Sequence, residues 1–276
     1  MSTTGTLAVP GAVLHHHIEG TGPLLLISQS GEGDADRTVD LVPLLTDTYT
    51  VLTYDRRGLS RSRLDPPERG ATLAEHADDV RRLLEAFADG PALMLGCSFG
   101  AVIGLHVAAQ HPGLLRTLIA HEPVAPGLLE PAEATRHRRE LVELQELYER
   151  DGLSVALPEI ARVLGIDPSG AGAEPDLTPQ PIDARRAANF DRFIRHDFTA
   201  VVEDALDHDA VRAATTRIVP AAGRTTPPDV FDRRCAQALG DLRGTPVEEL
   251  PGGHNGNTSH PRAWAARLKE IFGPVQ

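Results

Sequence analysis

The pentapeptide Gly96-Cys97-Ser98-Phe99-Gly100 has the G-x-S-x-G pattern of a nucleophilic serine. An apolar run at residues 91–95 comes directly before it, and a second at residues 101–109 directly after it. A strand, this pentapeptide and a helix, in that order, place the serine on a sharp, strained turn. Small neighbours let the backbone pass close by. The sequence therefore predicts a nucleophilic Ser98 hydroxyl above a sheet, in preference to an ordinary tight turn.

His254 is the candidate base for this serine. A serine hydroxyl is a weak nucleophile near neutral pH, so a neighbouring group must take its proton. His254 follows the last predicted strand, in the segment Pro251-Gly-Gly-His254. Because parallel strands end at one edge of a sheet, it would share that edge with Ser98, and a serine that precedes its histidine fits this architecture. The alternative is a surface-loop histidine without a catalytic function.

Two carboxylates compete to orient the histidine and stabilise its protonated form. Glu122 directly follows the strand that comes after the serine. Asp229 follows the next strand but lies six residues beyond Gly223, and it would also serve as the cap of a helix that begins near residue 230. We favour Glu122 as the acid, and Asp229 is the alternative.

A third requirement is a pair of backbone amides that stabilise developing negative charge on oxygen. The residue after the nucleophile, Phe99, supplies one of them. The other is expected from the loop at residues 28–33, where Gly31 allows a close backbone approach. The alternative is that Gly31 is simply a loop glycine.

These residues must be positioned by alternating strands and helices. Short apolar runs predict strands at residues 24–27, 50–54, 91–95, 114–120, 216–222 and 246–250. Apolar spacing predicts a helix over 72–88, capped by Thr72 with Glu75, and a last helix from Pro261 to Phe272. The alternation indicates an α/β protein with a mostly parallel sheet flanked by helices.

One region interrupts the alternation. Between residues 123 and 210 the sequence has helical stretches and no good strand. We therefore expect a core domain made of residues 1–122 and 211–276, with residues 123–210 inserted as a helical lid. The aromatic residues of this region, Tyr148, Phe190, Phe193 and Phe198, would line a pocket or belong to the core.

The composition of the chain limits the classes of partner that it is expected to bind. The chain has 276 residues and a net charge of −12, which argues against nucleic acid or an anionic membrane as a partner. There is no run long enough for a membrane helix and no signal-peptide pattern, so we expect a cytoplasmic protein with Cys97 and Cys235 as free thiols. The expected partner is a small-molecule substrate. No metal or cofactor is expected, and the oligomeric state is not readable.

The chain resembles the α/β-hydrolase superfamily over essentially its whole length. The resemblance rests on residues 54–62 (YDRRGLSRS), on the serine pentapeptide, on His121-Glu122-Pro123 and on Pro251-Gly-Gly-His254. Within the superfamily the chain looks like the zearalenone-lactonase-type branch, because an acid follows the strand after the serine and Ser259-His260-Pro261 follows the histidine. The resemblance implies an α/β-hydrolase fold, Glu122 as the acid and Gly31 as the second oxyanion amide. Ser60 departs from the usual pattern, where a glycine stands.

Together these residues predict a serine hydrolase that cleaves an ester or lactone of a medium-sized apolar molecule through an acyl-enzyme. Related dehalogenases and epoxide hydrolases use an aspartate at the position of Ser98. Two alternatives stay open on the same fold: a ligand-binding receptor, and a biosynthetic enzyme that catalyses cyclisation or acyl transfer.

Overall fold

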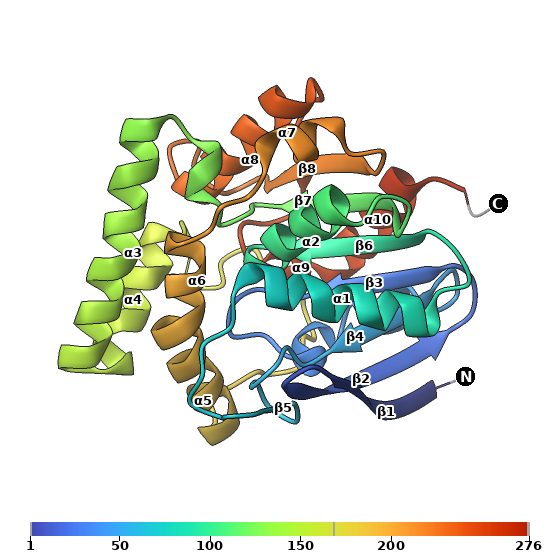
Figure 1. Cartoon of the computed structure of the whole chain (residues 1–276), viewed down its shortest axis with the longest axis horizontal. Helices are drawn as coiled ribbons and strands as arrows, with labels where there is room; N and C mark the ends of the chain where they lie inside the picture. The colour runs from blue at the N-terminus through green and yellow to red at the C-terminus, as the bar shows by residue number, and fades with distance from the viewer. Residues whose placement is uncertain (1, 168, 275–276) are drawn as a thin grey trace.

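A nine-stranded sheet runs through the computed structural model, which describes residues 2–167 and 169–274 (Figure 1). The strand order is β1-β2-β4-β3-β6-β7-β8-β9, and β5 pairs with β2. The strands are β1 Ser2–Val9, β2 Ala12–Gly20, β3 Leu24–Ser28, β4 Thr50–Tyr54, β5 Arg63–Leu64, β6 Ala92–Cys97, β7 Leu115–His121, β8 Arg217–Gly223 and β9 Glu248–Leu250. In the part of the order that runs β4-β3-β6-β7-β8-β9, every neighbouring pair is parallel, so the carboxyl ends of these strands lie at one edge of the sheet.

The predicted α/β class with a mostly parallel sheet is confirmed. All six predicted strands are present, β4 with its predicted bounds and the others within two residues at either end. The structure adds an antiparallel hairpin at the N-terminus, in which β1 pairs with β2. Most of β1 is exposed or half-buried, so this edge strand carries little of the apolar signal on which strand prediction depends.

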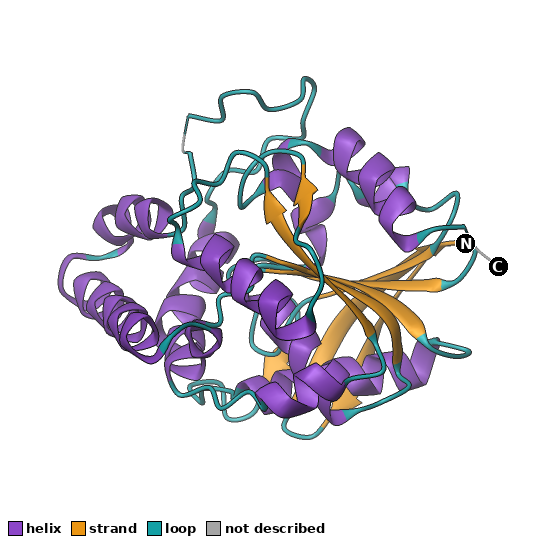
Figure 2. Ribbon diagram, turned by 90° about the horizontal axis from the view of Figure 1, so that it is seen from above, coloured by secondary structure: helices purple, strands orange, loops and turns teal. Residues whose placement is uncertain are grey.

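Helices cover both faces of the sheet (Figures 1 and 2). The helices of the described residues are α1 Leu73–Phe87, α2 Phe99–Gln110, α3 Pro131–Asp151, α4 Leu153–Val163, α5 Ala184–Arg192, α6 Phe198–Val202, α7 His208–Ala213, α8 Phe231–Arg243, α9 Gly256–Ser259 and α10 Pro261–Phe272. Side chains of α1, α2 and α8 form the core on one face, and α10 with the buried Trp264 closes the other. No helix in the described parts of the chain is long and apolar enough to span a membrane.

The predicted cap of α1 is confirmed in detail. The Thr72 hydroxyl accepts a hydrogen bond from the Glu75 amide at 3.2 Å, and the Glu75 carboxylate accepts one from the Thr72 amide at 2.9 Å. Two amides that the helix leaves without internal acceptors are thereby satisfied.

The region between β7 and β8 is helical, and Figure 1 shows α3 to α6 beyond the ends of the strands. Its apolar side chains, Phe190, Phe193 and Phe198 among them, continue the core of the α1–α2 face. The predicted boundary at residue 210 falls within α7, which packs against α2 and α8. The division into a core domain and a lid at 123–210 stays a prediction.

Cys97 and Cys235 are both buried free thiols, as predicted. Cys97 ends β6 and packs in the apolar cluster beneath α10, whereas Cys235 lies in α8 and packs in the cluster of the opposite face. Burial raises the pKa of each thiol far above its usual value.

Candidate active site

Ser98 lies on a tight turn between β6 and α2. Its backbone has φ +55° and ψ −116°, a conformation that costs about 1–3 kcal/mol for a residue other than glycine. A side chain at Gly96 would lie 2.6 Å from the Gly100 carbonyl oxygen, and one at Gly100 would overlap the Ser28 carbonyl. The two glycines are therefore required by the close approach of the backbone. The predicted order of strand, strained serine and helix is confirmed.

His254 lies in the loop after β9, at the carboxyl edge of the sheet. The loop can approach the sheet because Gly223 and Gly253 meet backbone to backbone: a Cβ on Gly223 would lie 2.6 Å from Gly253. His254 and Ser98 are both buried and line one cavity. The structure thus brings the two residues to the shared edge at which the sequence predicted them.

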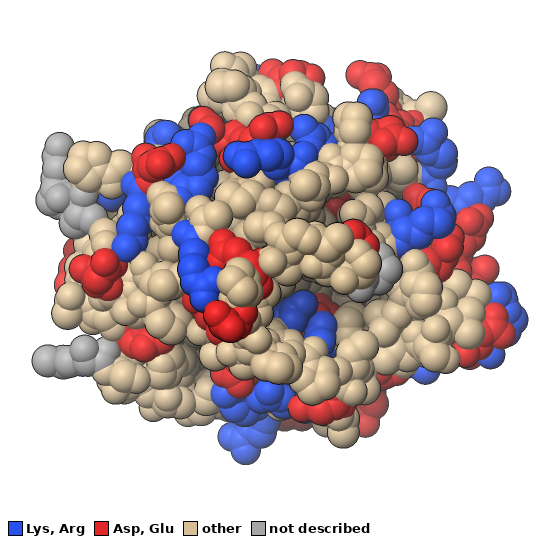
Figure 3. Space-filling view, turned by 180° about the vertical axis from the view of Figure 1, so that it is seen from behind, with Lys and Arg blue, Asp and Glu red and all other residues tan. Residues whose placement is uncertain are grey.

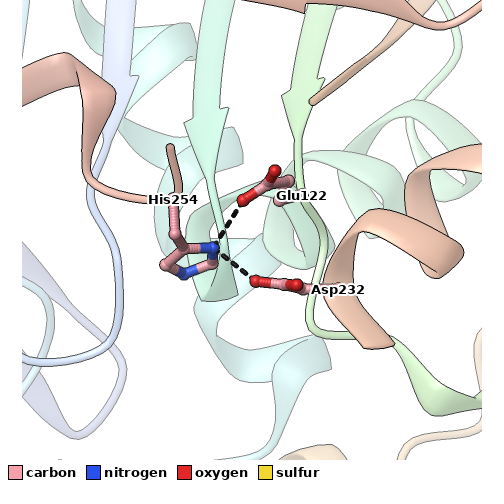
Figure 4. Close-up of side chains that lie close together, drawn as sticks. All are labelled: Glu122, Asp232 and His254. Atoms are coloured by element: carbon pink, nitrogen blue, oxygen red, sulfur yellow. Dashed lines mark hydrogen bonds and ion pairs between the residues drawn. The ribbon is translucent and has the colours of Figure 1, made fainter. Parts of the chain in front are cut away.

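Glu122 binds the imidazole from the end of the strand next to that of Ser98. It follows β7, has φ +43°, and its Oε2 lies 2.8 Å from His254 Nδ1 (Figure 4). Its other oxygen accepts a hydrogen bond from the Gly223 amide at 2.8 Å. Two bonds of this kind orient the carboxylate and fix the tautomer of His254 with its proton on Nδ1.

The alternative acid, Asp229, is exposed and is not among the groups in contact with His254. The prediction that Asp229 caps the following helix is wrong. The helix α8 begins at Phe231 and its N-cap is Val230, where no side chain in the described part of the chain forms a cap hydrogen bond. Asp229 is the residue before the N-cap, and the side chain that accepts hydrogen bonds from the first-turn amides is that of the N-cap residue itself.

A second carboxylate lies beside His254 that the sequence interpretation missed. Asp232 projects from the first turn of α8, and its Oδ2 lies 2.5 Å from the same Nδ1 atom (Figure 4). Nδ1 carries a single proton, and its hydrogen bond goes to Glu122. Asp232 Oδ2 is buried, and within the described residues its contact with Nδ1 is an ion pair and not a hydrogen bond. An acidic residue in the first turn of a helix is common and favours the helix dipole, so the sequence offered no signal that set Asp232 apart.

Glu122, Asp232 and His254 shift one another's pKa values. Burial raises the pKa of Asp232 to about 6, and the negative charge of Glu122 adds to this effect. Burial also opposes ionisation of Glu122, but the imidazoles of His121 and His254 outweigh it and lower its pKa to about 2. Burial alone would lower the pKa of His254, yet Asp232 and Glu122 outweigh it and raise that pKa to about 10. The two carboxylates therefore favour the imidazolium form of His254.

Among the described residues, Glu122, Asp232 and His254 form a group whose donor atoms could bind a metal, since these atoms lie within 4.8 Å of one another. Ligands at about 2.0–2.2 Å from a zinc ion would stand roughly 3 Å or more apart. The Nδ1 contacts of 2.5 and 2.8 Å are shorter than that. The spacing therefore fits two carboxylates around an imidazole better than two ligands of one ion.

The two predicted oxyanion residues come from the helix that follows Ser98 and from the loop after β3. Phe99 is the first residue of α2, so its amide is one that the helix leaves without an internal acceptor. Gly31 lines the same cavity as Ser98 and His254. A side chain on Gly31 would overlap the ring of Phe193, so glycine is required here by close packing against the helical region.

The cavity above Ser98 has a volume of about 730 Å³. Its walls are mostly apolar side chains of α4, of the segment between α4 and α5, of α5 and of the π-helical turn after α5: Leu157, Pro158, Ile160, Ala161, Leu164, Ile166, Ile182, Phe190 and Phe193. Glu32, Arg37, Arg162 and Arg186 supply its charged lining. On the face shown in Figure 3, acidic and basic side chains are interspersed around a hollow that has basic side chains inside it.

Comparison with known proteins agrees with this architecture. Residues 23–150 match the model of the alpha/beta hydrolase fold family. The "Uncharacterized hydrolase YraK" of Bacillus subtilis (strain 168) is 32% identical over 97% of this chain and 95% of that protein, and the zearalenone hydrolase of Bionectria ochroleuca is 25% identical over 98% of each. The structure of a thermophilic esterase from Thermogutta terrifontis superposes with a TM-score of 0.74 at 20% identity, over 99% of this chain and 98% of that one. The chain belongs to the α/β-hydrolase superfamily.

Proposed function

We propose that this protein is a serine hydrolase that cleaves an ester or lactone of a medium-sized apolar molecule through an acyl-enzyme. The observation that carries the proposal is the strained, buried Ser98 in one cavity with His254, whose Nδ1 is held by Glu122 at 2.8 Å. The hydrolases named among the relatives and neighbours support the reaction class.

The reaction begins with proton transfer from Ser98 Oγ to His254 Nε2 as the oxygen attacks the substrate carbonyl carbon. The resulting oxyanion accepts hydrogen bonds from the amides of Phe99 and Gly31. Glu122 stabilises the imidazolium, which then protonates the leaving alkoxide as the carbon–oxygen bond breaks. Water, deprotonated by the same histidine, attacks the acyl-enzyme. The bond from the acyl carbon to Ser98 Oγ then breaks, the imidazolium returns the proton to Ser98 Oγ, and the acid is released. For a lactone, the alkoxide stays attached to the acyl group, so the product is one hydroxy acid.

The cavity supports an uncharged substrate body of moderate size. Apolar walls gain from contact with apolar groups at roughly 25 cal/mol per Å² of surface removed from water. A volume of about 730 Å³ lies within the range of about 300–1,000 Å³ that is typical of small-molecule sites. The residues of α4 and α5 would therefore select the acyl or alcohol group by its shape.

The test is to treat the protein with a fluorophosphonate probe, locate the adduct by peptide mass spectrometry and assay short-chain p-nitrophenyl esters in parallel. We expect a single adduct at Ser98 that is absent in Ser98→Ala and in His254→Ala, together with ester turnover. Product masses on a lactone panel should show the gain of one water, which separates hydrolysis from cyclisation or acyl transfer. Folded protein that neither reacts at Ser98 nor turns over esters would overturn the proposal in favour of a ligand-binding receptor.

A further inference from the structure

Arg56 carries a buried positive charge next to the loop that holds Gly31. It follows β4 in the segment Asp55-Arg56-Arg57, and 1% of its surface is exposed. Its ion-pair partner is Asp197, with Nη2 to Oδ2 at 3.0 Å, and 3% of the surface of Asp197 is exposed. A pair buried to this extent is costly unless its hydrogen bonds are well satisfied, and replacing it by apolar groups is often stabilising. Its presence therefore calls for an explanation other than stability.

The guanidinium of Arg56 binds three successive carbonyl groups of one loop. Its Nη1 donates to the Ser30 carbonyl at 2.8 Å and to the Gln29 carbonyl at 3.4 Å, and its Nη2 donates to the Gly31 carbonyl. The same group lies over the ring of Phe99, with Cζ 4.8 Å from the ring centroid. Arg56 thus contacts both segments that supply the proposed oxyanion amides.

The bond to the Ser30 carbonyl has a direct geometric consequence. A trans peptide group is planar, and its C=O and N–H point in opposite directions. The carbonyl of Ser30 and the amide of Gly31 belong to one such group. Since Arg56 holds the carbonyl on one side, the Gly31 N–H must point to the other, and Gly31 lines the cavity that contains Ser98.

The far end of the ion pair belongs to the helical region. Asp197 ends a π-helical turn, Phe193–Asp197, whose first residue packs against Gly31. Its second carboxylate oxygen lies 3.7 Å from His76 Nε2 in α1. Extra-residue turns of this kind often occur at functional sites. One turn therefore reaches the Gly31 loop twice, through the Phe193 ring and through the charge of Asp197.

We propose that Arg56 is a positioning residue that orients the Ser30–Gly31 peptide so that the Gly31 N–H meets the oxyanion, and that Asp197 holds Arg56 in place. This inference rests on the proposed serine hydrolase function. The neighbouring Arg57 supplies a matched control, because it forms a buried pair of its own, at 2.6 and 2.7 Å from Asp79, and is not among the groups bonded to the loop. Both arginines come from the same turn of the chain.

The experiment compares Arg56→Lys with Arg57→Lys in the full chain. Lysine keeps the positive charge beside Asp197 but cannot span several carbonyls with a planar fork. The assays are p-nitrophenyl ester kinetics, inhibition by an aryl trifluoromethyl ketone, whose adduct with serine carries an oxyanion, and thermal unfolding. For Arg56→Lys we expect kcat to fall by about 10- to 100-fold with KM changed less than about threefold, since losing one oxyanion donor lowers kcat by about 10²–10³-fold. Affinity for the ketone should weaken by the same factor as kcat/KM.

Arg57→Lys should lower the unfolding temperature while leaving kcat and ketone affinity within about threefold of the parent protein. Asp197→Asn, which keeps the size of the side chain, should lower kcat and ketone affinity together by a smaller factor, and it carries the test if Arg56→Lys does not fold. Equal losses in both lysine variants, or unchanged kcat and ketone affinity in folded Arg56→Lys, would overturn the inference and leave the proposed function standing. A parent protein unreactive at Ser98 would overturn both.

Discussion

Replacing Asp232 by asparagine should shift the pH dependence of catalysis to lower pH. The base must be neutral to accept the proton of Ser98, so activity rises as His254 loses its proton. The Asp232 carboxylate, 2.5 Å from His254 Nδ1, favours the protonated imidazole and raises its pKa. Asparagine has nearly the same shape and removes the charge. The pKa of His254 then falls, and the acidic limb of the rate profile moves down with it.

The size of the shift follows from Coulomb's law. Each charge is spread over several atoms, so the centres of the two charges are taken as about 4 Å apart. At that separation two unit charges interact by about 4 kcal/mol at an effective dielectric constant near 20, which corresponds to about three pKa units. This is an upper value, because the Oδ1 atom of asparagine can still accept a hydrogen bond from the protonated imidazole. We expect a shift of about one to three pH units.

The assay is kcat/KM for a p-nitrophenyl ester from pH 5 to pH 10, corrected for spontaneous hydrolysis. Asp229→Asn is the matched control, since Asp229 is an exposed carboxylate three residues earlier in the chain and its loss should leave the profile unchanged. An acidic limb in folded Asp232→Asn that coincides with that of the parent protein would refute the reasoning, and so would a shift to higher pH.

Three further outcomes are expected. Glu122→Gln should lower kcat by about a hundredfold or more, because the Nδ1 proton loses its charged acceptor, whereas Asp229→Ala should stay within about threefold; steady-state kinetics would show the reverse order if Asp229 were the acid. Gly31→Ala should lose most ester turnover, because the new methyl group meets the Phe193 ring, and Phe193→Ala should restore part of it; a fully active Gly31→Ala would contradict this packing. Ser98→Gly should be inactive but more stable than Ser98→Ala by about 1–3 kcal/mol in denaturant unfolding, because glycine relieves the backbone strain at φ +55°; equal stabilities would show that this turn stores no strain.

The parts of the fold with local signals were predictable from the sequence. The capping box of Thr72 and Glu75 is encoded within four residues, and β4 follows from five apolar or β-branched residues in a row. The strained turn at Ser98 likewise depends on its own glycines. The position of His254 followed from one tertiary rule, that parallel strands end at a common edge.

The remainder depends on contacts between distant residues. Strand β1 lies at the edge of the sheet. Its backbone pairs with β2 while its threonine side chains stay exposed, so its sequence has no apolar pattern that would predict a strand. Asp232 meets His254 only because α8 packs beside the loop after β9, and the packing requirement at Gly31 comes from Phe193, far along the chain. Helix α8 also begins two residues after Asp229, and helix propensity does not predict the first residue of a helix to within two residues.

The labelling rates of the two buried cysteines can be used to measure local unfolding of this protein. A thiol with a raised pKa and no access to solvent reacts with a maleimide or disulfide reagent only while the surrounding structure is open. Cys97 is sealed beneath α10 and Cys235 within the core of the opposite face, so each labelling rate reports on one side of the sheet. Inactivation by such reagents would accordingly measure how often the structure around Cys97, next to Ser98, opens locally. The ratio of the labelling rates of Cys97 and Cys235 would show which face of the sheet opens more often.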